Sequence, residues 1–253
     1  MKVFNDGLPK LIYNFLTTEF YDHDASRNTI SATTLLKPTK EILLCQRHDD
    51  EIVLPASGRI WSLFGSGVHA ALEKMHTDKH IEQEERLYTK VNGMLISGKF
   101  DVVMDNELND YKVTSVWTVV YGSRKAEWIK QMSIYRYLYY KSKKIELKPT
   151  ANIITILRDW ASRDLLRCKN YPKAPIVEVH LDLMSFEETE KMIVDKTTEI
   201  KASMDIPDDG LPPCTDEERW LNKKKKIYNK CSKYCSCFEF CTQGKEGETN
   251  GYK

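Results

Sequence analysis

The sequence lacks the features that mark membrane, secreted or strongly basic proteins. No apolar run is long enough to span a bilayer, and the first ten residues, MKVFNDGLPK, contain no apolar segment of a secretory signal. The formal net charge is only +1, so no overall basic field indicates nucleic-acid binding. The sequence also contains no internal repeat and no long low-complexity stretch. From these absences we expect an intracellular protein without a membrane partner.

Cysteine is scarce along most of the chain and crowded near its end. Five of the seven cysteines lie after residue 213. A reducing compartment disfavours disulfides, so this crowding predicts a metal site. Four thiolates suffice for a tetrahedral zinc ion or an iron–sulfur cluster, and free thiols in a flexible tail are the alternative. The ligands we expect first are Cys214, Cys231, Cys235 and Cys241, with Cys45 and Cys237 in reserve.

At 253 residues with 41% hydrophobic content, the chain can bury a substantial core. Periodicity and turn residues predict helices over most of 10–60 and over 61–78, 123–141 and 185–204, and strands over 86–91, 94–104, 109–116, 151–159 and 174–182. Asn92-Gly93 predicts a tight turn, and Ser185 with Glu188 predicts a helix-capping box. This order indicates an α/β or α+β fold with a mixed sheet. We expect an N-terminal helical region over 1–60, a core over 61–204 and a cysteine-rich segment over 205–253.

One predicted hairpin gathers charges of both signs. In GKFDVVMDNELNDYKVTS, residues 98–115, apolar residues alternate with Asp101, Asp110 and Lys112. A turn centred between Asn106 and Glu107 would place Asp101 opposite Lys112 and all three charges on one face. A solvent-exposed strand face is the ordinary explanation for such alternation.

Two helical pairs accompany the hairpin. His69 and Glu73 are four residues apart, as are Gln131 and Tyr135, so each pair shares a helix face. Taken singly, a histidine on a helix is more often a packed or solvated residue than a metal ligand. The glutamine and tyrosine would ordinarily be surface positions.

Together these residues form the series Gly65-x3-His69-x2-Leu72-Glu73, Gly98-x2-Asp101, Asp110-x-Lys112 and Gln131-x3-Tyr135. The series, within residues 58–141, resembles the PD-(D/E)XK nucleases of the RecB-like exonuclease branch. The Pro-Asp of the family name is Phe100-Asp101 here, a change that this branch tolerates. The resemblance implies a restriction-endonuclease-like core, with a mixed central sheet flanked by helices.

The resemblance also implies a role for each site residue. Mg²⁺ or Mn²⁺ would be held by His69, Asp101, Asp110 and the backbone carbonyl of Tyr111, and an imidazole ligand favours Mn²⁺. Lys112 would orient the attacking water, help to deprotonate it and balance charge on the scissile phosphate. Glu73 would orient a ligand or the water. Gln131 and Tyr135 would position the lysine or the nucleic-acid backbone.

The cysteine-rich segment carries a second resemblance. Cys231-x3-Cys235-x5-Cys241 is similar to the C-terminal triplet of iron–sulfur RecB-like nucleases, in which the usual spacing is x2 and then x5. That family takes its fourth ligand from before the core, where Cys45 is the only candidate; Cys214 is nearer in sequence. A [4Fe-4S] cluster is preferred over Zn²⁺ on this resemblance alone.

These observations predict a metal-dependent DNA exonuclease of phage or bacterial recombination or repair, in the cytoplasm of a bacterium or an infected host. The chain has no G-x4-G-K-[ST] phosphate loop, so a helicase would be a partner, as would a single-strand annealing protein. The alternatives are a structure-specific or nicking endonuclease on the same scaffold and a non-catalytic DNA-end-binding subunit. A basic run could follow the phosphates of DNA or simply be solvated: Lys223, Lys224, Lys225 and Lys226.

Overall fold

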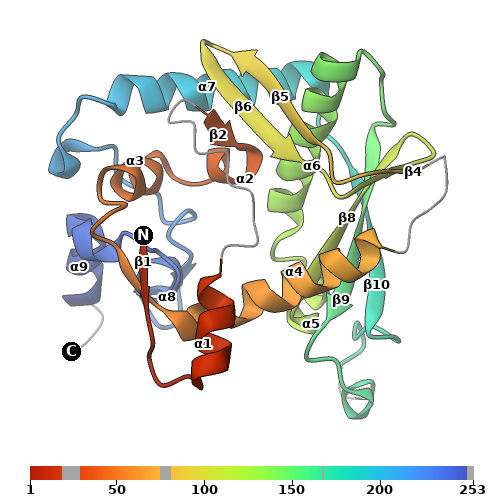
Figure 1. Cartoon of the computed structure of the whole chain (residues 1–253), viewed down its shortest axis with the longest axis horizontal. Coiled ribbons are helices and arrows are strands. Elements are labelled where there is room, and N and C mark those ends of the chain that lie inside the picture. The colour runs from red at the N-terminus through yellow and green to blue at the C-terminus, as the bar shows by residue number, and fades with distance from the viewer. Residues whose placement is uncertain (19–28, 75–80, 167, 250–253) are drawn as a thin grey trace. The chain divides into compact units, whose positions relative to one another are not determined.

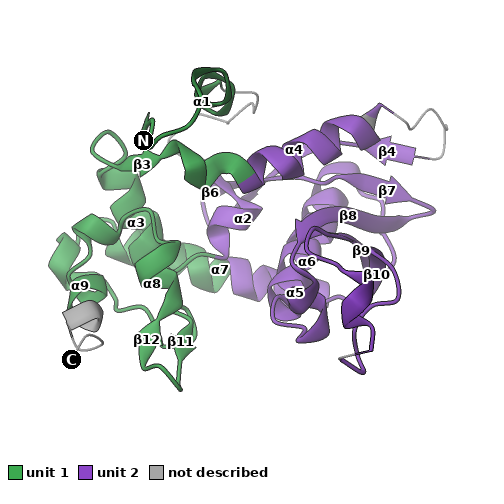
Figure 2. Cartoon of the chain, turned by 90° about the horizontal axis from the view of Figure 1, so that it is seen from below, with its two compact units in different colours: residues 1–23, 37–60, 194–253 green, residues 24–36, 61–193 purple. Residues whose placement is uncertain are grey.

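The computed structural model describes residues 1–18, 29–74, 81–166 and 168–249 (Figure 1), apart from the side chains of Glu73 and of residues 247–249. The chain divides into two compact units (Figure 2). Unit 1 comprises residues 1–23, 37–60 and 194–253, and unit 2 comprises residues 24–36 and 61–193. None of the described helices is long and apolar enough to cross a membrane.

Unit 2 is built on a mixed five-stranded sheet, in the order β10-β9-β8-β7-β4. β8 and β9 run parallel, and the other neighbours are antiparallel. The strands are β4 (Ile81–Gln83), β7 (Val102–Met104), β8 (Glu107–Thr114), β9 (Thr150–Leu157) and β10 (Ile176–Asp182). The expected mixed α and β character is therefore confirmed.

A separate three-stranded sheet has the order β2-β6-β5. Its strands are β2 (Thr29–Ser31), β5 (Arg86–Val91) and β6 (Met94–Lys99). Asn92 and Gly93 both have positive φ and join β5 to β6 as the sequence predicts. The single strand predicted over 94–104 is wrong, because the chain leaves this sheet at Phe100-Asp101 and enters the five-stranded sheet as β7.

The turn between β7 and β8 also differs from the prediction. Asp105 and Asn106 both adopt positive φ, 52° and 60°, as a two-residue hairpin turn requires. Met104 therefore pairs with Glu107, and Val102 with Asn109. Relative to the predicted register the pairing is shifted by two residues. Because side-chain direction has period two, the face stays the same while the neighbour of Asp101 becomes Asp110.

The helices of unit 2 lie mainly after β8. They are α2 (Ala32–Leu35), α4 (Ile60–Glu73), α5 (Val116–Val120), α6 (Lys125–Lys143), the 3-10 turn η2 (Ser162–Asp164) and the first part of α7 (Phe186–Ser203), whose residues from Val194 belong to unit 1. The capping box that begins α7 is confirmed, since the backbone N–H of Ser185 donates to Glu188 and that of Glu188 donates to Ser185. The predicted helix over 61–78 is described as far as Glu73, and its last residues from Met75 lie outside the described chain.

Unit 1 combines elements from both ends of the chain. The N-terminal elements include more β structure than the mostly helical prediction for 10–60, because short strands flank the helices. Unit 1 contains β1 (Lys2–Phe4), α1 (Lys10–Thr17), α3 (Thr39–Arg47), β3 (Val53–Pro55), η1 (Ala56–Arg59), η3 (Asp208–Gly210), β11 (Leu221–Asn222), β12 (Ile227–Tyr228), α8 (Asn229–Lys233), η4 (Phe238–Phe240) and α9 (Thr242–Thr249).

A histidine at the end of α3 joins these distant segments. The two ring nitrogens of His48 lie 2.7 Å from carboxylate oxygens of Glu51 and Asp208, and the ring stacks on Phe240 at 4.0 Å. Arg47 also pairs with Asp208, at 2.6 Å. Hydrogen bonds that the ring donates to Asp208 and Glu51 raise the pKa of His48, which favours its charged form beside two carboxylates. These contacts hold α3, which carries Cys45, within the same unit as the cysteine-rich segment.

Helix α6 packs against the strand that leads to Asp101. A Cβ added at Gly98 in β6 would lie 2.7 Å from Leu138 and 2.9 Å from Tyr135, both on α6. Phe100 is fully buried, with its ring 5.7 Å from that of Tyr139. Glycine at position 98 therefore permits the close approach of β6 and α6.

We expect Gly98→Ala to destabilise unit 2, because both contacted side chains are buried and cannot move away freely. Overpacking of this kind costs about 1–3 kcal/mol, and we expect a melting temperature several degrees lower in a thermal denaturation experiment. Gly65→Ala is the matched control. An added Cβ there has open space, and alanine is the better helix former, so its melting temperature should be unchanged or higher. Equal melting temperatures for Gly98→Ala and the wild type would contradict this packing.

Candidate metal centre

Three potential metal ligands meet in unit 2. Nδ1 of His69 on α4 lies 3.6 Å from Oδ2 of Asp101 and 3.8 Å from Oε1 of Glu84. The donor atoms of all three side chains lie within 4.8 Å of one another. Carboxylate oxygens with one imidazole suit Mn²⁺ and are compatible with Mg²⁺. This group can hold a divalent metal ion.

Asp101 lies in an environment that disfavours its charge. Burial and then the nearby charge of Asp110 raise the pKa of Asp101 to about 7, although Lys112 and the backbone N–H of Tyr111 act in the opposite direction. That N–H donates to Oδ2 of Asp101 at 2.8 Å. A cation bound here would counteract this rise, because its positive charge would stabilise the ionised carboxylate pair.

Asp110 is almost fully buried, with 2% of its side chain exposed. Its Oδ2 lies 2.7 Å from Nζ of Lys112, two residues later on β8. Burial alone would lower the pKa of Lys112, but the charges of Asp110 and Asp101 outweigh burial and raise it. Lys112 is therefore an ammonium group at neutral pH in the absence of a metal.

His69 is suited to act as a ligand. Burial is the main cause of its lowered pKa, opposed by the charge of Asp110 and by a backbone hydrogen bond with Tyr111. The neutral ring is the form that binds metals. The backbone N–H of Tyr111 donates to Asp101. The backbone hydrogen bond between Tyr111 and His69 raises the histidine pKa, which requires an acceptor, so the group of Tyr111 that takes part is its carbonyl oxygen. The role of this carbonyl as a metal ligand stays a prediction.

The prediction from sequence missed Glu84. It adopts φ 50°, a left-handed conformation, and its backbone N–H donates to the carbonyl oxygen of Asp101 at 3.0 Å. Its side chain forms an ion pair with Lys99, from β6. The positive φ of a non-glycine residue is a local strain that often accompanies function, but no spacing in the sequence links Glu84 to His69 or Asp101.

The remaining motif residues take other positions. Gln131 and Tyr135 are buried rather than on the surface, and Nε2 of Gln131 donates to the hydroxyl of Tyr135 at 2.9 Å. Tyr135 also packs against Gly98, three residues before Asp101. This pair therefore supports the strand leading into the site. The side chain of Glu73 lies outside the part that the structure describes.

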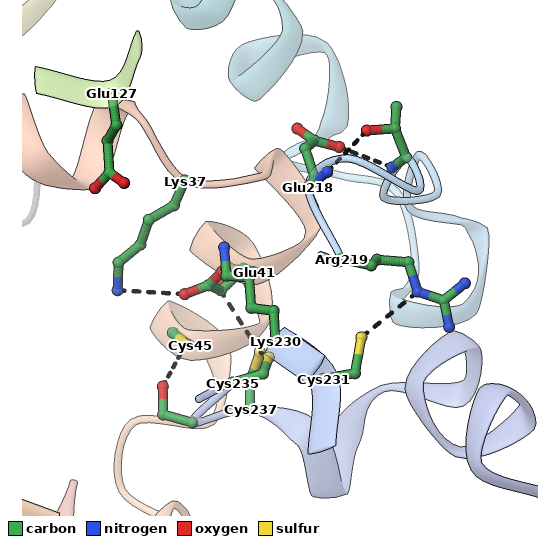
Figure 3. A network of polar contacts seen from close by, with 12 residues as sticks. Lys37, Glu41, Cys45, Glu127, Glu218, Arg219, Lys230, Cys231, Cys235 and Cys237 are labelled. Atoms are coloured by element: carbon green, nitrogen blue, oxygen red, sulfur yellow. Dashed lines mark hydrogen bonds and ion pairs between the residues drawn. The ribbon is translucent and has the colours of Figure 1, made fainter. Parts of the chain in front are cut away.

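The cysteines gather in unit 1, around a pocket. Figure 3 shows part of this region, including Glu41 between the ammonium groups of Lys37 and Lys230, at 3.4 and 2.7 Å. The buried cations and anions beside the thiols give the pocket mixed polarity. Its cysteines are Cys214, Cys231, Cys235, Cys237 and Cys241, and its charged residues are Lys40, Glu41, Glu218, Arg219 and Lys230.

Cys45 and Cys237, the two reserve cysteines, contact each other and their neighbours Cys235 and Ser236. Sγ of Cys237 lies 3.5 Å from Sγ of Cys235, and Cys45 approaches Oγ of Ser236 at 3.2 Å. A hydrogen bond with Cys237 is the main cause that lowers the pKa of Cys45 to about 7. Burial raises the pKa of Cys214 to about 12, and the neighbouring Glu218 and thiols add to this effect.

The distances between the cysteine sulfur atoms can be compared with those that a zinc site requires. With Zn–S bonds of about 2.3 Å, a tetrahedral zinc site places its sulfurs about 3.8 Å apart. Among the residues that the structure describes, no three cysteine sulfurs lie within 4.8 Å of one another. A cluster needs wider spacing, because each thiolate binds a different iron. The described thiols therefore do not form a preformed tetrahedral zinc site, and a [4Fe-4S] cluster in this pocket stays a prediction.

Four lysines occupy the turn between β11 and β12. Lys223 to Lys226 are all exposed, and the backbone N–H groups of Lys224 and Lys225 donate to Oδ1 of Asn222 at 3.1 Å. The turn is thus fixed locally while the ammonium groups face solvent. DNA binding by these lysines stays a prediction.

No protein-family model matches the chain, and no curated protein matches it in sequence. The crystal structure of SSO0001 is similar, with a TM-score of 0.58 and 16% sequence identity, covering 92% of this chain and 94% of that one. A phage-related exonuclease from Haemophilus somnus 129PT has a TM-score of 0.30 and 15% identity, covering 65% and 72% of the two chains. The second likeness is too low to support an argument. The first shows a shared overall fold and nothing about activity.

Proposed function

We propose that the protein is a metal-dependent nuclease that hydrolyses phosphodiester bonds in DNA, acting as an exonuclease in phage or bacterial recombination or repair. The observation that supports this best is the group of His69, Glu84 and Asp101 beside the buried Asp110–Lys112 pair. Such a set combines oxygen and imidazole ligands with a fixed cation next to them. DNA as the substrate and the cytoplasm as the location are proposed from the motif resemblance.

In this proposal a divalent ion is held by His69, Glu84, Asp101, Asp110 and the carbonyl of Tyr111. When bound, Mg²⁺ or Mn²⁺ polarises the phosphate and lowers the pKa of a ligated water. Lys112 contributes its charge, because the raised pKa keeps it protonated beside the two carboxylates. Its ammonium group can therefore orient a phosphate oxygen and the attacking water. Gln131 and Tyr135 act indirectly, by positioning the strand before Asp101.

The alternatives differ in how DNA is presented. A structure-specific or nicking endonuclease would use the same residues with a different DNA-binding surface. A DNA-end-binding subunit would not need residues that hydrolyse a phosphodiester bond. The buried carboxylate pair disfavours that last interpretation, since the raised pKa of Asp101 reflects a cost that a bound cation would reduce and a site that binds DNA alone has no reason to keep.

For the pocket of unit 1 we propose a [4Fe-4S] cluster, with Zn²⁺ as the alternative. Cys214, Cys231, Cys235 and Cys241 are the proposed ligands, a choice that follows the motif spacing, and all four line the pocket together with Cys237. Cys45 and Cys237 stay in reserve, since their contacts are mainly with each other and with Cys235 and Ser236. The exposed Lys223–Lys226 turn would contact DNA, and a helicase or annealing protein would be the further partner.

We expect Asp110→Asn and Lys112→Ala to abolish cleavage of end-labelled DNA in Mg²⁺ or Mn²⁺. The first replaces a ligand by an amide of the same shape, and the second removes the cation beside the phosphate. Cleavage rates on labelled single- and double-stranded DNA measure the effect, with Asp182→Asn, an exposed carboxylate on β10, as control. Wild-type rates in both variants, at unchanged metal dependence, would contradict the assignment.

Metal binding can be tested without activity. His69→Ala and Glu84→Gln each remove one donor atom, so we expect the dissociation constant for Mn²⁺ to rise by about tenfold or more, as measured by calorimetry. His180→Ala is the matched control, because His180 is exposed on β10 of the same unit. If His69→Ala lowers only the melting temperature and leaves Mn²⁺ affinity unchanged, the histidine is a packing residue.

The thiol pocket gives a spectroscopic prediction. Protein purified without oxygen should be brown, with visible absorption that bleaches on oxidation, and Cys241→Ser should remove the colour and bound iron. Cys168→Ser, in unit 2, is the matched control and should leave both unchanged. A colourless protein with about one equivalent of zinc would establish the alternative. Neither metal on elemental analysis, with equal protease resistance before and after chelation, would leave free thiols.

A further inference from the structure

Among the exposed aromatic side chains of unit 2, four lie on α4, on α5 and at the residue that ends α5. Trp61 and Phe64 are 56% and 53% exposed, and Trp117 and Tyr121 are 41% and 74% exposed. We call these four residues the aromatic strip. Contiguous exposed apolar surface is unfavourable in water, and it often marks a binding site.

The rings of the aromatic strip form two contacting pairs. The rings of Trp61 and Phe64 have centroids 5.7 Å apart, and those of Trp117 and Tyr121 are stacked at 5.8 Å with planes 22° apart. The guanidinium carbon of Arg158 lies 4.1 Å above the Trp61 ring. Part of the Trp117 side chain packs within the unit, since its ring meets that of Tyr171 edge-on. Trp61 and Tyr121 expose most of their surface to solvent.

The two pairs are joined at the ends of neighbouring parallel strands. The backbone N–H of Arg158, just after β9, donates to the carbonyl of Thr114, the last residue of β8. The Asp159 carboxylate then accepts hydrogen bonds from Ser115 and from the N–H of Val116, each at 2.6 Å. Trp117 follows directly. The aromatic strip therefore lies at the carboxyl ends of β8 and β9, where ligands bind in many α/β proteins.

The strip also adjoins the candidate metal centre. Lys112 lies two residues before the end of β8, and the charge of Arg124 acts on its ammonium group. Trp61 and His69 share α4, where eight residues correspond to a rise of about 12 Å. A strand whose phosphate reached His69 and Lys112 could thus extend along the aromatic rings.

The chemistry of the strip matches unpaired nucleobases. Every base presents a flat π-face that stacks on tryptophan, tyrosine or phenylalanine, and Arg158 above the Trp61 ring carries a charge that attracts phosphates. In a duplex these faces are hidden by base stacking. A surface of this kind therefore selects strands whose bases are already exposed.

We propose that the aromatic strip binds unpaired bases of the nucleic-acid strand that is cut at the metal centre, so that single strands and frayed ends are the preferred substrates. This rests on the proposed nuclease function for the position of the cut, whereas the binding surface itself can be tested alone.

The test measures binding by the full chain carrying Asp110→Asn, so that the strand is not cut. Fluorescence anisotropy follows a labelled 20-nucleotide oligo(dT), a strand of equal length without bases, and a blunt duplex. We expect Trp61→Ala and Trp117→Ala each to weaken oligo(dT) binding by about tenfold, within the range known for base–aromatic stacking. Binding of the base-free strand and the duplex should not change. Tyr140→Ala, an exposed aromatic on α6, is the matched control and should leave all three unchanged.

Several outcomes would overturn the proposal: no oligo(dT) binding by the parent, unchanged binding in both tryptophan variants, or equal losses for the strand without bases. If wild-type protein cuts DNA with metal while both tryptophan variants bind oligo(dT) normally, only the aromatic strip is wrong. If the variants lose oligo(dT) binding and the wild type cuts nothing in Mg²⁺ or Mn²⁺, the nuclease function is wrong and the strip remains a single-strand binding surface.

Discussion

The approach of two carboxylates, Asp101 and Asp110, is the constraint on which the rest of unit 2 depends. The rise in the pKa of Asp101 to about 7 corresponds to roughly 4 kcal/mol against its ionised form. Since the folded carboxyl retains its proton more strongly, the stability it contributes declines as pH rises toward 7. Lys112 offsets part of this cost from β8, and Lys99 neutralises Glu84 beside it. A divalent cation would supply the remaining positive charge, so the site is costly for folding alone and useful for binding.

Packing away from the charges maintains this geometry. The chain passes from one sheet to the other at Phe100-Asp101, and glycine at position 98 lets β6 lie directly against α6. The two-residue turn at Asp105-Asn106 then returns β8 in the register that brings Asp110 next to Asp101. The Gln131–Tyr135 hydrogen bond lies in the same packed layer. Residues without any contact to a substrate thus decide where the reactive groups lie.

Unit 1 has a comparable arrangement, in which thiols rather than carboxylates lie close together. Its thiols surround one pocket together with buried charges, including Lys40 and Arg219. Nε of Arg219 lies 3.5 Å from Sγ of Cys231, so a cation already faces one sulfur. Burial raises the pKa of Cys214, so a nearby positive charge would favour its thiolate form. Each unit therefore has its own cluster of potential ligand groups beside buried charges.

Local sequence patterns account for the features that depend on near neighbours along the chain. The capping box of Ser185 and Glu188, the Asn92-Gly93 turn and the common face of Asp101, Asp110 and Lys112 follow from local chemistry and from periods of 3.6 and 2. A register shift of two residues preserves that face, so only the tertiary structure could pair Asp110 with Asp101. Tertiary structure alone also placed Glu84 beside His69, and Cys45 beside Ser236, which is 191 residues away in sequence. Such contacts depend on how sheets and helices pack, and no local spacing encodes them.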